Sequence, residues 1–358
     1  MSNEKNIEFR RMQDSDDDLL RFRNCFRRNV GDKDIDHLRW QYLETPPGKF
    51  YVDFAVDGQP PEEQLAAIYA TFPVRFNVDG DRVLAVQSLD TLVDKDYRRQ
   101  GLFTRTAQSL FKSAEDDGVA FVYGFPNALS AGGFFGKLGW ESLDPVPFLI
   151  KPLRLNYFIK RLTRLEGVVE NLPDIPLSRR TYPELPENYE IKDQMIFGPE
   201  FSDVWREFSR DIPVAIERDA EYLTWRFIEN PREYEMVSLY HGPELVGYVV
   251  FCVRKKHSGK IGYIMEFVFL SEHEKQCQGL LRKAVSEMAC RGCDLLLAWN
   301  FSHSPNHKSY LVNKFFPLPR FLRPIELHIG VRPLASSRQG LLKERANWYI
   351  SYCDSDTV

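Results

Sequence analysis

Two arginines and a glycine stand at one turn of the chain, in the stretch Tyr97-Arg98-Arg99-Gln100-Gly101. Glycine lets the backbone approach a ligand closely, and a helix that begins there offers free N–H groups and the positive end of its dipole to an anion. Arg98 and Arg99 add positive charge beside these groups. The residue types and their spacing therefore predict a turn that binds an anion such as a pyrophosphate.

A strand and a helix must hold this turn in place. The residues before it, from Val83 to Val86 and from Leu89 to Val93, are mostly aliphatic or β-branched, which favours a strand. The residues after it, from Leu102 to Ala114, repeat apolar side chains at helical spacing. We therefore predict that the turn joins a strand to an amphipathic helix.

This junction resembles the acyl-CoA-binding motif of the GNAT N-acetyltransferase superfamily. Val93, Tyr97, Arg98 and Gly101 match that motif, whereas Phe103 replaces its second small residue and would crowd a pyrophosphate unless the ring points into the core. The resemblance implies that acetyl-CoA is the acyl donor, with its thioester and pantetheine on the strand end and its pyrophosphate on the turn. The cofactor-binding residues that it implies are Leu92, Val93, Arg98, Arg99, Gln100, Gly101, Leu102, Phe103 and Asn127.

A second block lies at the distance that the family requires. An apolar strand is predicted from Val119 to Phe125, Asn127 follows it, and Gly132 to Trp140 resembles the family's closing helix. In many relatives a tyrosine of that helix protonates the leaving thiolate, but the matching residue here is Phe135, which cannot. The resemblance covers residues 83–142 in all.

Acyl transfer to an amine also needs a base and a proton donor. Asp90 is an acidic residue within the strand before the turn, and burial would raise its pKa toward a useful range; a salt bridge or a turn at the sheet edge is the structural alternative. Tyr123 could replace the missing proton donor if its hydroxyl points into the cleft, although a tyrosine on an apolar strand is more often core. Asp90 and Tyr123 are therefore the catalytic candidates.

Composition indicates a globular protein with more than one domain. The chain has 358 residues, 43% of them hydrophobic, and a formal net charge of −4, without a basic face of the kind that binds nucleic acid. It has no apolar run that would span a bilayer and no secretory signal, so we expect a cytoplasmic protein without stable membrane insertion. Its six cysteines are scattered, and the Cys290–Cys293 spacing lacks the partners of a metal site, so we expect no metal.

The expected fold class is α/β (α+β), with two GNAT-like domains, each a central mixed, mainly antiparallel sheet flanked by helices. The first domain spans residues 1–165, a proline-rich linker spans 166–188, and the second domain spans 189–358. A strand from Phe148 to Ile150 should lie at the far edge of the first sheet.

The second half is interpreted as a degenerate copy of the first. Leu38 to Pro46 recurs as Leu223 to Pro231, with leucine, tryptophan, aromatic, aliphatic, glutamate and proline residues at the same offsets. At the position of the arginine-glycine turn, the second copy has Lys275-Gln276-Cys277-Gln278-Gly279, which lacks both arginines. We infer that only the first domain binds the cofactor and that the second supplies a wall of the acceptor cleft.

These observations favour an acetyl-CoA-dependent N-acetyltransferase that acts on a primary amine. The stretches from Tyr123 to Asn127 and from Phe134 to Trp140 resemble bacterial GNAT proteins of cell-surface polysaccharide and amino-sugar pathways, which makes an amino sugar or a polysaccharide precursor the leading acceptor. Two alternatives stay open. One is a non-catalytic acyl-CoA-binding or scaffold protein, and Phe103 and Phe135 favour it. The other is an aminoacyl transferase of the peptidoglycan cross-bridge type, which would ignore CoA and would not need Arg98.

Overall fold

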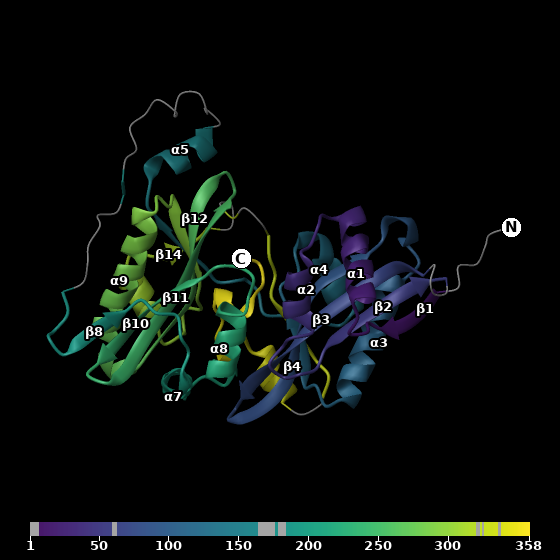
Figure 1. Ribbon diagram of the computed structural model, residues 1–358, viewed down its shortest axis with the longest axis horizontal. Helices are drawn as coiled ribbons and strands as arrows, with labels where there is room; N and C mark the ends of the chain where they lie inside the picture. The colour runs from purple at the N-terminus through teal and green to yellow at the C-terminus, as the bar shows by residue number, and fades with distance from the viewer. Residues whose placement is uncertain are drawn as a thin grey trace.

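The computed structural model describes residues 7–58, 63–163, 176–177, 184–319, 323, 326–335 and 338–358. The described chain forms two lobes, each built around one β-sheet and flanked by helices (Figure 1). This is the mixed α/β architecture predicted from the sequence. None of the helices described is both long and apolar enough to cross a membrane.

The first sheet contains the predicted junction. In spatial order its strands are β1 (Ile7–Arg11), β2 (Tyr51–Asp57), β3 (Gln64–Val78), β4 (Asp81–Val93), β5 (Phe121–Gly124), β15 (Gly330–Pro333) and β6 (Glu141–Ser142), and β9 (Val214–Ile216) pairs with β3. Its helices are α1 (Asp16–Asn29), α2 (Ile35–Tyr42), α3 (Leu102–Asp116) and α4 (Ala128–Lys137). Apolar side chains of α3 and α4 pack on one face of the sheet, and those of α1 and α2 pack on the other.

The second sheet repeats much of this pattern. In spatial order its strands are β14 (Phe316–Pro317), β7 (Phe148–Pro152), β13 (Leu295–Trp299), β12 (Gly259–Phe269), β11 (Glu244–Lys256), β10 (Glu235–His241) and β8 (Tyr189–Lys192). Its helices are α5 (Leu155–Thr163), α7 (Pro199–Phe208), α8 (Ala220–Phe227), α9 (Glu274–Cys290) and α10 (His307–Val312). A further helix, α11 (Gln339–Lys343), follows β15 and contacts that strand of the first sheet. β12 is parallel to β13, as β4 is to β5.

The two halves of the chain exchange strands: the first half gives β7 to the second sheet, and the second half gives β9 and β15 to the first. β7, which precedes the predicted linker, pairs with β13 and β14 of the second sheet, so the prediction that Phe148 to Ile150 border the first sheet is wrong. In return β15, from the C-terminal half, lies between β5 and β6 of the first sheet. The domain limits drawn at 165 and 189 stay a prediction, and most of the predicted linker, 166–175 and 178–183, lies outside the described residues.

The repeated tryptophans meet at the junction of the lobes. The indole rings of Trp40 in α2 and Trp225 in α8 are stacked, with centroids 4.8 Å apart and planes 18° apart. Trp40 Nε1 donates to the carbonyl of Trp225 at 2.8 Å, and Trp225 Nε1 donates to the carbonyl of Trp40 at 3.2 Å. The repeated segments therefore form a nearly symmetric contact, which explains why both copies have the tryptophan.

Candidate active site

A pocket of about 300 Å³ opens where the two parallel strands of the first sheet separate. β4 and β5 pair from Ala85 with Phe121 to Ser88 with Gly124, after which β5 ends and β4 continues to Val93. The later β4 residues therefore lose their parallel neighbour, which leaves room for a ligand between the strands. The lining comes from α1, β4, the loop after β5, α4 and the C-terminal tail, and includes Val30, Ser88, Asp90, Thr91, Asn127, Ser130, Phe134, Trp140, Ser355, Asp356 and Thr357.

Asp90 lies at an irregularity of β4 that turns it toward this pocket. The register with β3 shifts between the pairs Ile68–Leu92 and Ala70–Leu89. Asp90 has a φ of +47°, in the left-handed region that aspartate tolerates better than most residues. Bulges of this kind redirect side chains next to active sites. The structure thus places Asp90 in the pocket and also in an ion pair with Lys33, which is the salt bridge of the structural interpretation. The catalytic role of Asp90 stays a prediction.

A second carboxylate, that of Asp356, interacts with the same lysine. Asp90 Oδ2 accepts hydrogen bonds from Tyr42 Oη at 2.7 Å and from Lys33 Nζ, and Asp356 Oδ2 accepts one from Gln41 Nε2 at 2.7 Å. Burial, together with the negative charge of Asp356, raises the pKa of Asp90 in spite of Lys33. Burial also acts to raise the pKa of Asp356, but the charge of Lys33 and the hydrogen bond from Gln41 outweigh it and lower that pKa. Of the two carboxylates, Asp90 is therefore the one that binds a proton more readily.

Sequence analysis missed Asp356, Lys33 and Tyr42. The sequence repeat contains a signal for Tyr42. The first copy has Tyr42 where the second copy has Phe227, so only the first copy has a hydroxyl at this position. No comparable signal marks Asp356, because it reaches the pocket from the end of the chain.

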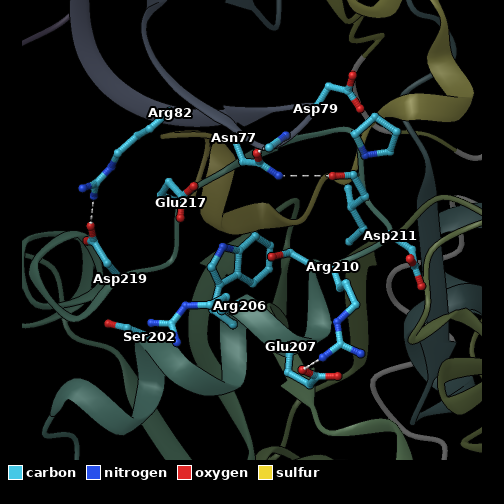
Figure 2. Close-up of a pocket in the computed structure, with 15 residues that line it drawn as sticks. Asn77, Asp79, Arg82, Ser202, Arg206, Glu207, Arg210, Asp211, Glu217 and Asp219 are labelled. Carbon is cyan, nitrogen blue, oxygen red and sulfur yellow. Dashed lines mark hydrogen bonds and ion pairs between the residues drawn. The ribbon is translucent and has the colours of Figure 1, made fainter.

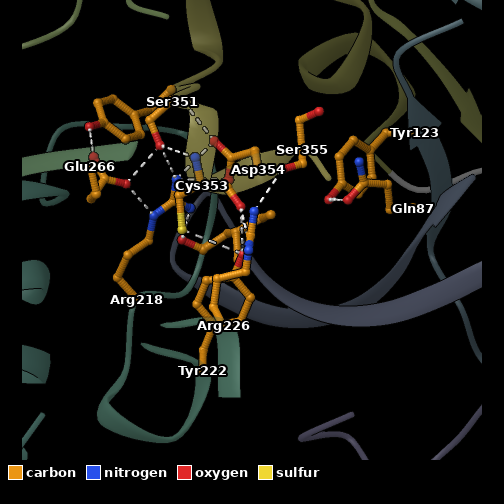
Figure 3. A network of polar contacts seen from close by, with 12 residues as sticks. Gln87, Tyr123, Arg218, Tyr222, Arg226, Glu266, Ser351, Cys353, Asp354 and Ser355 are labelled. Carbon is orange, nitrogen blue, oxygen red and sulfur yellow. Dashed lines mark hydrogen bonds and ion pairs between the residues drawn. The ribbon is translucent and has the colours of Figure 1, made fainter. Parts of the chain in front are cut away.

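Buried arginines of the second half hold the tail that carries Asp356 (Figure 3). Arg218, whose side chain is fully buried, pairs with Glu266 at 2.9 Å and with Asp354 at 2.7 Å. Arg226 donates to the carbonyls of Cys353 at 3.1 Å and Ser355 at 2.8 Å. The second half therefore contributes to the pocket through this tail, which bridges the lobes.

Neither Tyr123, the predicted proton donor, nor Phe135, which stands at the position of the family's tyrosine, lines the pocket. Tyr123 is buried among Phe76 and Trp348, and its hydroxyl donates to Gln87 Oε1 at 3.2 Å. Phe135 packs against His328 and Gly330 of the β15 region. The catalytic role of Tyr123 stays a prediction, and this position does not favour it.

The arginine-glycine turn has the geometry of an anion site. Gly101 is the N-cap of α3 with a φ of +71°, Arg99 has a φ of +66°, and no side chain caps the helix. Its first turn has no acidic residue, and Arg98, Arg99 and Gln100 are exposed. The first N–H groups of α3 are therefore free for a ligand.

Phe103 and Asn127, two of the predicted cofactor-binding residues, lie at α3 and α4. The ring of Phe103 lies between α3 and α4, with its centroid 5.5 Å from that of Phe134 and 6.3 Å from that of Tyr69. It fits because Gly133 has no side chain; a Cβ there would lie 2.9 Å from Phe103 Cε1. Asn127 caps α4 by accepting from the N–H of Leu129 and Ser130, so its carbonyl oxygen already serves the helix and only its amide N–H groups remain for a ligand.

A larger cavity, of about 850 Å³, opens between the β3–β4 hairpin and α7 (Figure 2). Its charged side chains largely neutralise one another, since Arg82 pairs with Asp219 and Arg210 with Glu207. Arg82 lies near the start of β4 and Asp90 near its end. Eight residues of an extended strand separate the two Cα atoms by about 25 Å. This cavity is therefore separate from the pocket that contains Asp90.

Comparison with known proteins agrees with this geometry. The family described as "Acetyltransferase (GNAT) domain" matches residues 8–143. No curated protein matches this sequence at a significant level.

Solved structures match the whole arrangement of lobes at low sequence identity. N-myristoyltransferase of Saccharomyces cerevisiae with bound myristoyl-CoA is 12% identical with a TM-score of 0.60, covering 91% of this chain and 82% of that one. A GCN5-related N-acetyltransferase from Anabaena variabilis is 12% identical with a TM-score of 0.62, covering 92% and 73%. A probable N-acyltransferase from Enterococcus faecalis is also 12% identical, with a TM-score of 0.56, covering 92% and 72%. Residues 8–143 therefore belong to the GNAT acetyltransferase family, within a chain that has a two-lobe GNAT fold.

Proposed function

We propose that this protein is an acyl-CoA-dependent N-acyltransferase that transfers an acetyl group to a primary amine. The observation that carries the proposal is the position of Asp90, which lies in the pocket between the separating strands of a GNAT domain whose uncapped α3 begins at an arginine-glycine turn. Two further groups of the pocket, Thr91 Oγ1 and Trp140 Nε1, are buried without a hydrogen-bond partner among the described residues. A polar ligand such as an amine acceptor or a thioester would supply partners.

The residues support direct transfer. An ammonium acceptor is attracted by the carboxylates of Asp90 and Asp356, and Asp90, with its raised pKa, takes one proton from it. The neutral nitrogen attacks the thioester carbon, the carbon–sulfur bond breaks, and the nitrogen gives a second proton, directly or through water, to the departing thiolate. The products are an amide, the free thiol and a proton held on Asp90, which returns to solvent.

The size of the pocket favours a short acyl group. Its volume of about 300 Å³ is at the lower end for ligand sites, and the large rings of Phe134 and Trp140 form part of its wall. An amino sugar or a polysaccharide precursor is the acceptor class that we propose to test first, on the resemblance of the stretches around Tyr123 and Phe134. The GNAT fold also occurs in a neighbour solved with myristoyl-CoA, so the acyl length needs its own test.

Calorimetric titration of acetyl-CoA and myristoyl-CoA tests the donor. We expect one site for acetyl-CoA, weaker binding of myristoyl-CoA, and loss of both in Gly101→Glu, which adds bulk and negative charge at the turn. Gly101→Ala is the control, because it shares the strain of a side chain at a φ of +71° but adds no charge, and an added Cβ meets no atom within 4 Å. Absence of binding to the folded wild type would refute the proposal.

Release of thiol with a panel of amines then tests turnover. Asp90→Asn should lower kcat by about 10²- to 10⁴-fold, the usual contribution of a general base, and leave acetyl-CoA binding intact. If the wild type binds acetyl-CoA but releases no thiol with any amine, the protein is a binding or scaffold protein instead.

A further inference from the structure

A cavity of about 680 Å³ in the second lobe gathers positive charge. It lies between α9, the end of α10, β7 and β14, and shares no lining residue with the pocket around Asp90. Lys151, Arg282 and Lys314 line it, and no acidic residue does so among the described part of the chain. The charge pattern therefore favours an anion.

Lys151 is the most buried of these cations. It is 7% exposed, and its Nζ donates to the carbonyl of Asn313 at 2.8 Å. An ammonium has three N–H donors, and within the described residues Lys151 has neither a second acceptor nor an ion pair. Burial, and then the charges of Lys314 and Arg282, lower the pKa of Lys151 to about 8. A buried cation is normally paired with an anion, and the described lining of this cavity supplies none for Lys151.

The outer part of the cavity is apolar. Four of the lining residues are apolar: Pro152, Val285, Val312 and Phe316. Val312 and Phe316 have exposed fractions of 48% and 46%, so they form the rim of the cavity. Single exposed apolar side chains are common on protein surfaces, but here two large ones adjoin the same basic cavity. A ligand that matches both parts has an anionic head and an aliphatic body.

We propose that this cavity binds a monomeric amphiphilic anion, with a phosphate or carboxylate head on Lys151 and Arg282 and an alkyl chain over Val312 and Phe316. The recess has the volume of a small-molecule site rather than the flat form of a membrane-binding face. The site is independent of acyl transfer in the first lobe.

Calorimetry with decyl phosphate below its micelle concentration tests this site, with inorganic phosphate and decanol as half-ligands. The protein used is Gly101→Glu, so that the anion turn of the first lobe does not contribute. We expect one decyl phosphate site, and binding at least tenfold weaker for inorganic phosphate and for decanol. Equal affinity for decyl phosphate and inorganic phosphate would refute the proposed use of the apolar rim, and the absence of saturable binding would refute the site.

Variants in the same background assign the cations. Lys151→Met and Arg282→Gln should each weaken decyl phosphate binding at least tenfold. Lys275 is exposed on α9, the helix that carries Arg282, but it does not line the cavity. Lys275→Gln should therefore change the affinity for decyl phosphate less than twofold. An equal loss in all three variants would show that general charge binds the probe, and would overturn the assignment. Arg282→Gln keeps the test decisive if Lys151→Met does not fold.

Discussion

Replacing Arg218 by methionine tests how the tail is held over the pocket. The guanidinium is fully buried and bonds both to Glu266 on β12 and to Asp354 in the tail. Methionine preserves much of the side-chain volume but leaves these two carboxylates without their cation. Glu266 would keep hydrogen bonds from Tyr349 Oη at 2.5 Å and Ser351 Oγ at 2.9 Å, and Asp354 would keep one from the N–H of Ser351 at 2.8 Å.

The expected loss is large. Removing one partner of a buried ion pair typically costs 3–5 kcal/mol, because the other charge stays buried and unpaired, so we expect Arg218→Met to lower the free energy of unfolding by about 4 kcal/mol. A domain with about 5–15 kcal/mol of stability would still fold. The combined variant Arg218→Met, Glu266→Gln, Asp354→Asn removes all three charges and should recover at least half of the loss.

Urea unfolding at pH 7 measures both variants. A loss below about 1 kcal/mol in Arg218→Met would refute the idea that the guanidinium holds the network together, and a combined variant no more stable than the single one would refute the unpaired-charge explanation. The loss in the single variant should also be smaller at pH 5. Burial raises the pKa of Asp354 and the charge of Arg218 opposes that rise, so losing Arg218 would raise this pKa further. The folded variant would then bind more protons than the unfolded chain, and its stability would fall as the pH rises.

Three further outcomes follow from the contacts around the pocket. Burial lowers the pKa of His37 from 6.5 to about 4, so the unfolded state binds more protons than the folded state between these values. The free energy of unfolding should therefore fall by about 3 kcal/mol as the pH drops through this window, and urea unfolding of His37→Gln should show a weaker loss of stability in acid. Trp40→Ala should cost about 3–5 kcal/mol in urea unfolding, and Trp40→Phe, which keeps a ring but loses the bond from Nε1, should cost less than half as much. Asp356→Asn should lower the pKa of Asp90, because it removes a negative charge, and Lys33→Met should raise it, because it removes a positive one. ¹³C NMR of labelled aspartate carboxyls measures this pKa, and Asp90→Asn assigns the signal. Shifts of the pKa in the same direction in both variants would contradict the shared-lysine geometry.

Local pattern predicted the parts of the site that one segment of chain encodes. The strand before the turn, the helix after it and the glycine between them appear as β4, α3 and the left-handed N-cap Gly101. Asp90 was found because a carboxylate within an apolar strand needs either a partner or a function, and here it has a partner and lies in a pocket.

Partners from distant segments could not be predicted in this way. Phe103 departed from the family pattern, and nothing near it showed that Gly133 would leave room for its ring. The strand from Phe148 was assigned to the wrong sheet because short apolar strands fit either sheet, and pairing is decided by side-chain packing against neighbours that the sequence does not name.

The exchanged strands make the pocket dependent on both lobes. Gly124 of β5, which lines the pocket, pairs with Gly330 of β15, and the indole of Trp140 lies against both glycines. A Cβ at Gly124 would lie 3.3 Å from the ring of Trp140, and one at Gly330 would lie 3.1 Å from it, so a side chain at either position would press on the ring. Asp356 reaches the same pocket on a tail held by Arg218 and other residues of the second half. One wall of the pocket and one of its two carboxylates thus form only when the C-terminal half has folded, so the second lobe contributes to the site although its copy of the turn lacks both arginines.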